Sequence, residues 1–165
     1  MKKVQAKNIL LLLISLLYIT NTQAVEKQTI GWLEHVAVGK QRLQFKAKID
    51  TGADTTSIRA KILREFTIDD DDWIEFELSN QHGQSIKLQQ KIERYVKIKR
   101  RLMPSIKRPV ILLGVCLGKV YRNVEVNLAQ RKNFKYSMLI GRNYLQGFYL
   151  VDSAETYTSL PTCTQ

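Results

Sequence analysis

The sequence predicts an all-β barrel with one short helix near its C-terminal end. Apolar and polar residues alternate, most clearly over residues 73–78, where three apolar side chains face one way and two glutamates the other. This is the period of a half-buried strand. Turn signals at 80–83 and 114–118 separate such runs. Helical patterns are sparse, with one or two turns expected over 58–66 and one more over 143–146, after Gly141, which favours a β-barrel fold.

The strands expected from these patterns are short and follow one another along the chain. They cover residues 43–49, 73–78, 86–88, 94–99, 110–113 and 120–128. No internal repeat or low-complexity linker interrupts them. One domain is therefore expected over residues 25–165.

The first 24 residues predict a secretory signal peptide. Lys2 and Lys3 precede an apolar run over 9–19, and small residues lead to a candidate cut after Ala24. The apolar run is short for a spanning helix, which needs about 20 residues, so cleavage is favoured over an inner-membrane anchor. We therefore expect an exported, periplasmic protein.

The charge is strongly positive, at +11, and falls to +8 once Lys2, Lys3 and Lys7 leave with the signal peptide. The excess is concentrated in the stretch from Lys91 to Arg108. Nucleic acid is not expected as a partner of an exported protein. The stretch favours a solvated strand face, with an acidic substrate, an anionic envelope surface or the acidic run from Asp69 to Asp72 as the alternative partners.

The segment Asp50-Thr51-Gly52-Ala53 comes directly after the expected strand 43–49 and carries the chemistry. The carboxylate can handle protons, the Thr hydroxyl can bond to a neighbouring backbone, and Gly allows close approach of backbone or substrate. Ordinary turns also collect Asp, Thr and Gly, so this segment alone is weak evidence.

A second segment, Leu139-Ile140-Gly141-Arg142-Asn143, strengthens the interpretation. Together with Asp50-Thr51-Gly52-Ala53-Asp54-Thr55-Thr56 it closely resembles the two signature segments of retropepsins, the small dimeric aspartic peptidases. The surrounding residues resemble the bacterial retropepsin-like family often labelled ATP-dependent zinc proteases. This resemblance implies a closed acid-protease barrel and an aspartic-type endopeptidase acting on peptides or proteins.

The resemblance also implies roles for the residues of both segments. Because Asp-Thr-Gly occurs once in the chain, a homodimer would supply two Asp50 carboxylates. Thr51 would bond across the dimer and Gly52 would contact the substrate backbone. The supporting or substrate-binding residues would be Ala53, Asp54, Leu139, Ile140, Gly141, Arg142 and Asn143. Among these, Asp54 and Arg142 are expected to form a two-bond pair. Removing one partner would cost about 3 to 5 kcal/mol if the pair is at least partly buried, whereas a surface pair would be worth about 0 to 1 kcal/mol.

Zinc and ATP, which the label of the bacterial family names, are not expected as cofactors. The two histidines, His35 and His82, lie in no close cluster of metal ligands. The segment from Gly114 to Lys119 is one residue short of a phosphate loop, and Val120 stands where a Ser or Thr is required. We therefore expect no metal site and no cofactor.

Several questions stay open at the level of sequence. The flap that covers substrate in retropepsins could be the hairpin around 80–84 or the loop 102–107, where Pro104 replaces the expected glycine. Cys116 and Cys163 could pair after export, but their separation in space is not predictable. The alternative functions are a retropepsin-like module of the cell envelope that binds peptides or a partner without turnover, and a purely structural protein.

Overall fold

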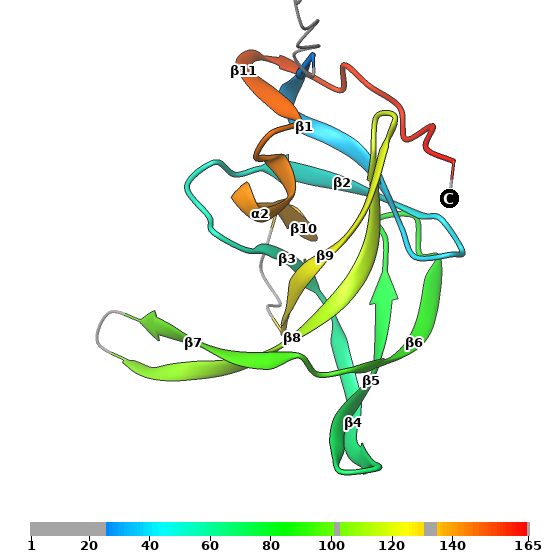
Figure 1. Ribbon diagram of the computed structural model, residues 1–165, viewed down its shortest axis with the longest axis vertical. Coiled ribbons are helices and arrows are strands. Elements are labelled where there is room, and N and C mark those ends of the chain that lie inside the picture. Colours follow the sequence, from blue (N-terminus) through cyan, green and yellow to red (C-terminus); the bar gives the residue numbers. More distant parts are fainter. Residues whose placement is uncertain (1–25, 101–102, 131–134, 165) are drawn as a thin grey trace, which may run out of the picture.

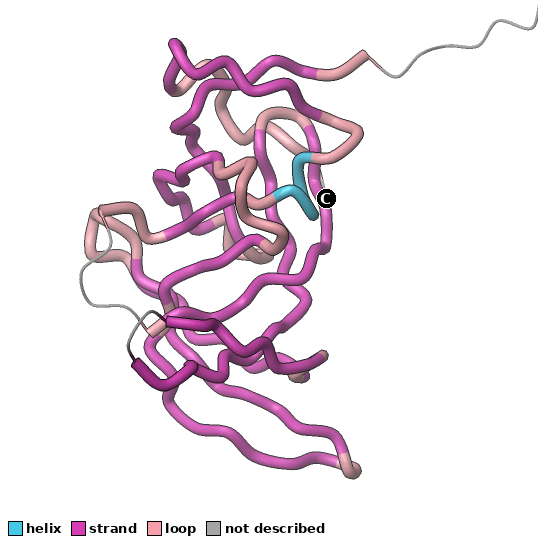
Figure 2. The backbone as a smooth tube through the Cα atoms, turned by 90° about the vertical axis from the view of Figure 1, so that its left-hand side faces the viewer, coloured by secondary structure: helices cyan, strands magenta, loops and turns pink. Residues whose placement is uncertain are grey.

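The computed structural model describes residues 26–100, 103–130 and 135–164. Within these residues the protein is mostly β-strand with one short helix, as predicted (Figures 1 and 2). The elements in chain order are β1 (Gln28–Val38), β2 (Leu43–Ile49), β3 (Thr56–Arg59), β4 (Lys61–Ile68), β5 (Asp71–Ser79), β6 (Ser85–Lys91), β7 (Arg94–Arg100), β8 (Met103–Leu117), β9 (Val120–Ala129), β10 (Met138–Ile140), α2 (Arg142–Leu145) and β11 (Tyr149–Thr156). No helix of the described part is both long and apolar enough to cross a membrane. The expected signal peptide lies outside the described residues.

Eight strands form the main sheet, in the order β11-β1-β2-β10-β3-β9-β8-β7. A further pairing joins β1 to β8, with Val36 opposite Leu117 and Val38 opposite Val115. This pairing curls the sheet back on itself. In the described residues the outer strands β11 and β7 do not pair with each other, so the expected barrel is only partly closed.

The core follows the alternation that the sequence predicts. In β2 the side chains of Leu43, Phe45, Ala47 and Ile49 are buried, and the intervening residues are exposed or half-buried. Strand β5 buries Ile74, Phe76 and Leu78 in the same way. Because successive strand residues point to opposite faces, each strand gives one face to a shared apolar core.

A second sheet, β4-β5-β6, is inserted between β3 and β7. Its β4–β5 hairpin projects from the rest of the molecule (Figures 1 and 2). The helix expected over 58–66 is wrong, because this segment belongs to β3 and β4. Strand β4 pairs with β5 from Lys61 opposite Glu77 to Ile68 opposite Asp71, and these ladder hydrogen bonds override the moderate helix propensity of the segment.

The turn expected over 114–118 is also displaced. Strand β8 continues through Gly114 to Leu117, and the turn is formed by Gly118 and Lys119. A Cβ atom at Gly114 would lie 2.0 Å from the hydroxyl oxygen of Tyr121. Gly114 is thus a strand glycine that leaves room for a neighbouring side chain, whereas Gly118, with φ +55°, takes the left-handed turn conformation.

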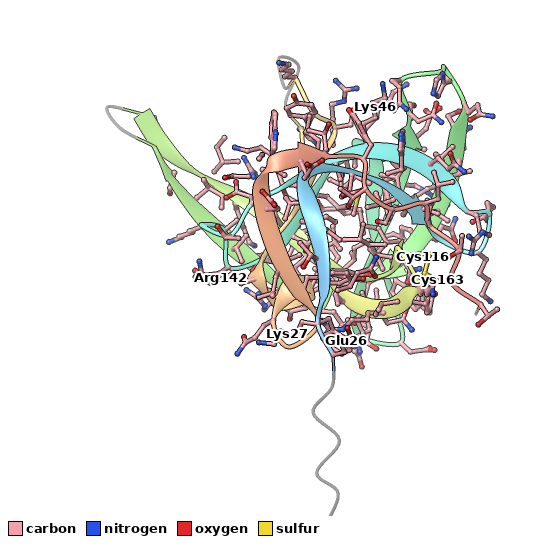
Figure 3. All side chains as sticks on the ribbon, turned by 90° about the horizontal axis from the view of Figure 1, so that it is seen from above. Glu26, Lys27, Lys46, Cys116, Arg142 and Cys163 are labelled. Carbon is pink, nitrogen blue, oxygen red and sulfur yellow. A yellow bond between two sulfur atoms is a disulfide. The ribbon has the colours of Figure 1, made fainter. Side chains whose placement is uncertain are left out.

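The chain after β11 returns along the sheet and is held by a disulfide between Cys116 and Cys163, whose Cα atoms are 5.9 Å apart (Figure 3). Arg42 donates to the carbonyl oxygens of Pro161 and Cys163, at 2.6 and 2.9 Å. The buried carboxylate of Glu34 accepts hydrogen bonds from the backbone and hydroxyl of Thr158, at 3.0 and 2.6 Å. The disulfide between Cys116 and Cys163, which the sequence left open, is therefore present.

Candidate active site

The two signature segments lie side by side because their strands pair. Strand β10 runs parallel to β2, with Ile140 opposite Ile49. The N–H of Asp50 donates to the carbonyl oxygen of Ile140 at 2.9 Å. The ends of both strands thus meet at one point of the sheet, and the turn after β2 starts beside the Gly141-Arg142-Asn143 segment.

The turn that carries Asp50 presents its carboxylate at the surface of the single chain. Asp50 is half-buried, while Thr51 and Gly52 are exposed. The N–H of Gly52 donates to Asp50 Oδ1 at 3.1 Å, and the N–H of Ala53 donates to the Asp50 carbonyl at 3.2 Å. The turn therefore orients the carboxylate through backbone contacts and leaves Thr51 and Gly52 accessible to a second molecule.

Arg142 ties this turn to helix α2. Its guanidinium forms an ion pair with Asp54 and donates through Nη1 to the carbonyl oxygens of Thr51, at 2.8 Å, and Gly52, at 3.0 Å. The expected two-bond fork to Asp54 is thus divided between a carboxylate and two carbonyls. The Asp54 side chain is 85% exposed and that of Arg142 is 48% exposed, so the pair lies at the surface of the single chain.

Gly141 packs directly against the chain that follows the turn. A Cβ atom there would lie 2.7 Å from the carbonyl carbon of Thr55 and 3.0 Å from the oxygen of Ala53. The backbone N–H groups of Arg142 and Asn143 donate to the carbonyls of Ala53 and Asp54, at 2.8 and 3.0 Å. This close approach needs a residue without a side chain.

Buried Thr56 and half-buried Asn143 form the polar centre of the site. The N–H and the hydroxyl of Thr56 both donate to Asn143 Oδ1, at 2.9 and 2.8 Å. The N–H of Gly141 donates to the Thr56 hydroxyl at 3.1 Å, and Asn143 Nδ2 donates to the Glu125 carbonyl at 2.8 Å. These bonds hold the start of β3, α2 and β9 as one unit.

From the sequence, Thr56 is predicted only as part of the first segment, without a role of its own, and Asn127 is not predicted as a site residue. Asn127 Nδ2 donates to the Thr56 carbonyl at 3.1 Å, and Asn127 is 6% exposed. Its signal was an amide between the apolar residues Val126 and Leu128, since a polar residue in a buried strand needs a partner. Of the remaining expected residues, Ile140 is buried and Leu139 is half-buried in β10.

The described residues of the stretch from Lys91 to Arg108 comprise the end of β6, all of β7 and the start of β8. Several of its cations have partners within the chain: Lys91 with Asp71, Arg94 with Glu125, Lys107 over the Tyr95 ring, and Arg108 with Asn127. The hydrogen bond from Arg94 lowers the pKa of Glu125 below its usual value. These contacts fit a strand face better than a free cationic patch. Contact with an anionic envelope surface stays a prediction.

A hollow of about 550 Å³ lies away from Asp50, where the start of β4 approaches the end of β5 and Gln130. Its lining includes Arg59, Lys61 and Glu77. A cleft shared between two copies of a chain would not be enclosed by one copy. Within the described residues, no three His, Cys, Asp or Glu side chains are grouped so that they could hold a metal ion.

The fold and site define a class, the β-rich proteins that carry one Asp-Thr-Gly turn braced by a Gly-Arg-Asn segment. Within this class the chain belongs to the RimB-like family, described as retropepsin-like aspartic endopeptidase RimB, whose profile matches residues 29–162. This confirms the resemblance inferred from the two segments.

Relatives at the sequence level carry a different name. The chain is 33% identical over 129 residues to a probable alpha-L-glutamate ligase of Shewanella pealeana, covering 76% of this chain and 28% of that protein. A protein of the same name from Desulfotalea psychrophila is 28% identical over 139 residues, covering 81% of this chain and 30% of that protein. The chain thus spans less than a third of the length of these relatives.

A solved structure has a similar fold over nearly its whole length. It is the crystal structure of a Legionella pneumophila protein of unknown function, with a TM-score of 0.70 and 33% identity. The match covers 81% of this chain and 98% of the Legionella chain.

Proposed function

We propose that this chain is an exported aspartic endopeptidase that acts as a homodimer, with one Asp50 carboxylate from each copy. The observation that carries the proposal is the Asp50 turn braced by Gly141, Arg142 and Asn143 in a chain of the RimB-like family. The chain contains one such turn, and aspartic peptidase chemistry requires two carboxylates. A two-fold axis beside Asp50 supplies the second.

Two carboxylates at close range share one proton, because both cannot ionise cheaply. The ionised Asp50 takes a proton from a bound water as its oxygen attacks the scissile carbonyl carbon. The protonated Asp50 of the other copy donates its proton to the carbonyl oxygen, which gives a neutral gem-diol. The protonated carboxyl then gives its proton to the amide nitrogen as the C–N bond breaks. The ionised carboxylate takes a proton from one gem-diol hydroxyl as the product carboxylic acid forms, so the dyad again holds one proton.

The substrates to test first are acidic peptides. The mature chain carries a charge of +8, and the family segment also occurs in proteins named probable alpha-L-glutamate ligases. The ligase name describes proteins of which the match covers only 28%, so ligation is not transferred to this chain. A peptide with a run of glutamates, compared with a neutral peptide of equal length, tests substrate class and peptidase activity together.

Asp50→Asn is the variant that tests the mechanism. It keeps the shape of the side chain and removes the titrating group, so peptide cleavage should fall to background. The melting temperature should stay similar or rise, because repulsion between the two carboxylates is relieved. Wild-type cleavage should also survive EDTA.

Matched controls separate this mechanism from its rivals. Asp152→Asn makes the same change in an exposed acid of β11, and should leave cleavage intact. Cleavage that persists in Asp50→Asn, or that EDTA abolishes, would favour a metal-dependent mechanism. A folded dimer that binds peptides tightly but cleaves none would favour the non-catalytic binding module.

A further inference from the structure

Three buried polar residues outside the catalytic turn form a connected series. The buried polar or charged side chains of the described residues include Thr56, Arg108 and Asn127, with 0%, 6% and 6% of their surface exposed. Polar groups buried to this degree must be hydrogen-bonded to persist. In this protein they bond to one another across three strands.

The series begins in the β7–β8 hairpin and ends at Thr56, the first residue of β3 after the Asp50 turn. Arg108 in β8 donates through Nη1 to Asn127 Oδ1 at 3.3 Å. Asn127 in β9 donates through Nδ2 to the Thr56 carbonyl at 3.1 Å. Thr56 opens β3 and bonds to both Gly141 and Asn143. The amide of Asn127 thus uses its acceptor toward the hairpin and its donor toward the site.

A second connection runs parallel to the first. In β7, Arg94 binds the Glu125 carboxylate through Nε, at 3.0 and 3.2 Å, and through Nη2, at 2.5 Å. Asn143 Nδ2 donates to the backbone carbonyl of the same Glu125 at 2.8 Å. Both strands of the hairpin therefore contact β9 at residues that also bond to the site.

The figures place the two connected parts on one side of the molecule. The loop after β2 and the β7–β8 hairpin both lie on the left in Figure 1, and Figure 3 shows the labelled Arg142 on the same side as the hairpin. Of the two connections, Arg94–Glu125 is exposed, and an exposed ion pair is screened by solvent and stabilises little. The buried connection, through Arg108, therefore has the larger effect on the site.

We propose that Arg108 is a positioning residue that couples the β7–β8 hairpin to the Asp50 turn through Asn127 and Thr56. Moving the hairpin or removing the guanidinium then changes the order of the turn, although Arg108 touches neither Asp50 nor its neighbours in sequence. A buried guanidinium often contributes little net stability compared with an apolar residue, so a role in fixing one arrangement accounts for its presence. The catalytic consequence of this coupling rests on the proposed function, whereas the coupling itself does not.

The test compares Arg108→Gln with Lys97→Gln in the mature chain. Lys97 is an exposed cation in β7 of the same hairpin, so its variant makes the same change of charge without touching the series. Amide hydrogen exchange is measured over residues 50–56 and 138–145. Arg108→Gln should raise exchange in both segments roughly fivefold or more, the lower end of typical coupling between sites, while Lys97→Gln leaves both unchanged.

Two outcomes would overturn the coupling. One is faster exchange in β8 and β9 with unchanged protection over 50–56, which would make Arg108 a local structural residue. The other is an equal effect of Lys97→Gln, which would reduce the result to net charge. Arg108→Lys retains one donor toward Asn127 and should restore part of the protection; it also keeps the test informative if Arg108→Gln does not fold.

A catalytic readout distinguishes failure of this inference from failure of the proposed function. If the chain cleaves peptides, Arg108→Gln should lower kcat and alter the pH profile of kcat, because the order of the Asp50 turn changes. Lys97→Gln should change KM alone or nothing. Altered exchange in a protein without cleavage would support the coupling and reject the peptidase, whereas cleavage with normal kcat and pH profile in Arg108→Gln would reject the coupling.

Discussion

Arg142 links the Asp50 turn to helix α2 through one side chain that binds a carboxylate and two backbone carbonyls. Only a guanidinium can do this, since its planar array of donors can point at several acceptors at once. In the single chain these acceptors are open to solvent, where an ion pair contributes about 0 to 1 kcal/mol. The cost of about 3 to 5 kcal/mol expected for a buried pair would require the second copy to cover Arg142 and Asp54.

Replacing Arg142 by Lys therefore separates the monomer from the dimer. Lys keeps the charge but cannot reach Asp54 and both carbonyls together. At dilutions where the chain is monomeric, we expect Arg142→Lys to lose less than about 1 kcal/mol of unfolding free energy. At concentrations that favour the dimer, the loss should be several times larger. Thermal melts at the two concentrations measure this, and an equal loss at both would place the pair outside the interface.

Single residues show what the sequence can and cannot predict about the site. Asp50 is identified by its local chemistry, and Gly141 and Asn143 by the resemblance of their segment to the retropepsin signature. Asn127 and Arg108 have no such local reason. Their importance comes from the pairing of β3 with β9 and of β8 with β9, which only the folded chain reveals.

At the scale of elements, alternation predicts strands well and their ends poorly. Strand β5 appears as expected, because its apolar residues mark one face over its whole length. Strand β8 is far longer than the expected segment 110–113, since it pairs with β7 at one end and with β9 and β1 at the other. Residues 103–107 of the second flap candidate, expected as a loop, form the start of β8, and residues 101–102 lie outside the described part. The role of flap for this hairpin stays a prediction.

Strand β11 is fastened to β8 by a tyrosine that should make stability depend on alkaline pH. The Tyr149 hydroxyl donates to the Leu117 carbonyl at 2.7 Å, and the residue is 7% exposed. Burial raises the pKa of Tyr149 to about 12, against about 10 in the unfolded chain. A raised folded pKa means that the contribution of Tyr149 is complete below pH 10 and is lost as pH rises through 12.

We therefore expect the free energy of unfolding to fall between pH 10 and 12, and to fall less steeply in Tyr149→Phe. Phe removes the titrating group at the cost of one hydrogen bond, so the variant should be less stable at pH 7 by about 1 kcal/mol. The exposed Tyr157 provides the control, since Tyr157→Phe should keep the wild-type slope. Urea melts at several pH values measure both. An unchanged slope in Tyr149→Phe would assign the alkaline loss to other groups.

At the scale of the whole molecule, one chain supplies half of the proposed site. The main sheet leaves β11 as an outer strand, with Leu150 54% exposed. An exposed edge strand with an apolar residue is available for contact with another chain. An edge of this kind is compatible with contact to a second copy of the chain.

Sedimentation of the mature chain tests the proposed assembly directly. We expect a homodimer at least when a transition-state inhibitor of aspartic peptidases is present, because the inhibitor binds only the paired site and draws the equilibrium toward the dimer. Asp50→Asn should weaken this response to the inhibitor. A chain that stays monomeric under all conditions, with inhibitor at saturating concentration, would exclude the proposed mechanism.

The disulfide between Cys116 and Cys163 bears on the stability of the whole chain rather than on the site. It closes a loop between residues 47 positions apart and fastens the C-terminal segment to β8. Chain entropy alone gives such a crosslink about 4 kcal/mol. The contacts of Glu34 and Arg42 with the same segment do not depend on the crosslink, so the C-terminal segment should stay partly docked in a chain that lacks it.

We expect the double variant Cys116→Ala, Cys163→Ala to lose about 2 to 4 kcal/mol of unfolding free energy and to melt roughly 10 °C lower, with the order of the Asp50 turn unchanged. Reduction of the wild type with dithiothreitol should reproduce the loss, and the same treatment of the double variant should change nothing. If complete reduction left the melting temperature of the wild type unchanged, Glu34 and Arg42 would be shown to hold the segment without the crosslink.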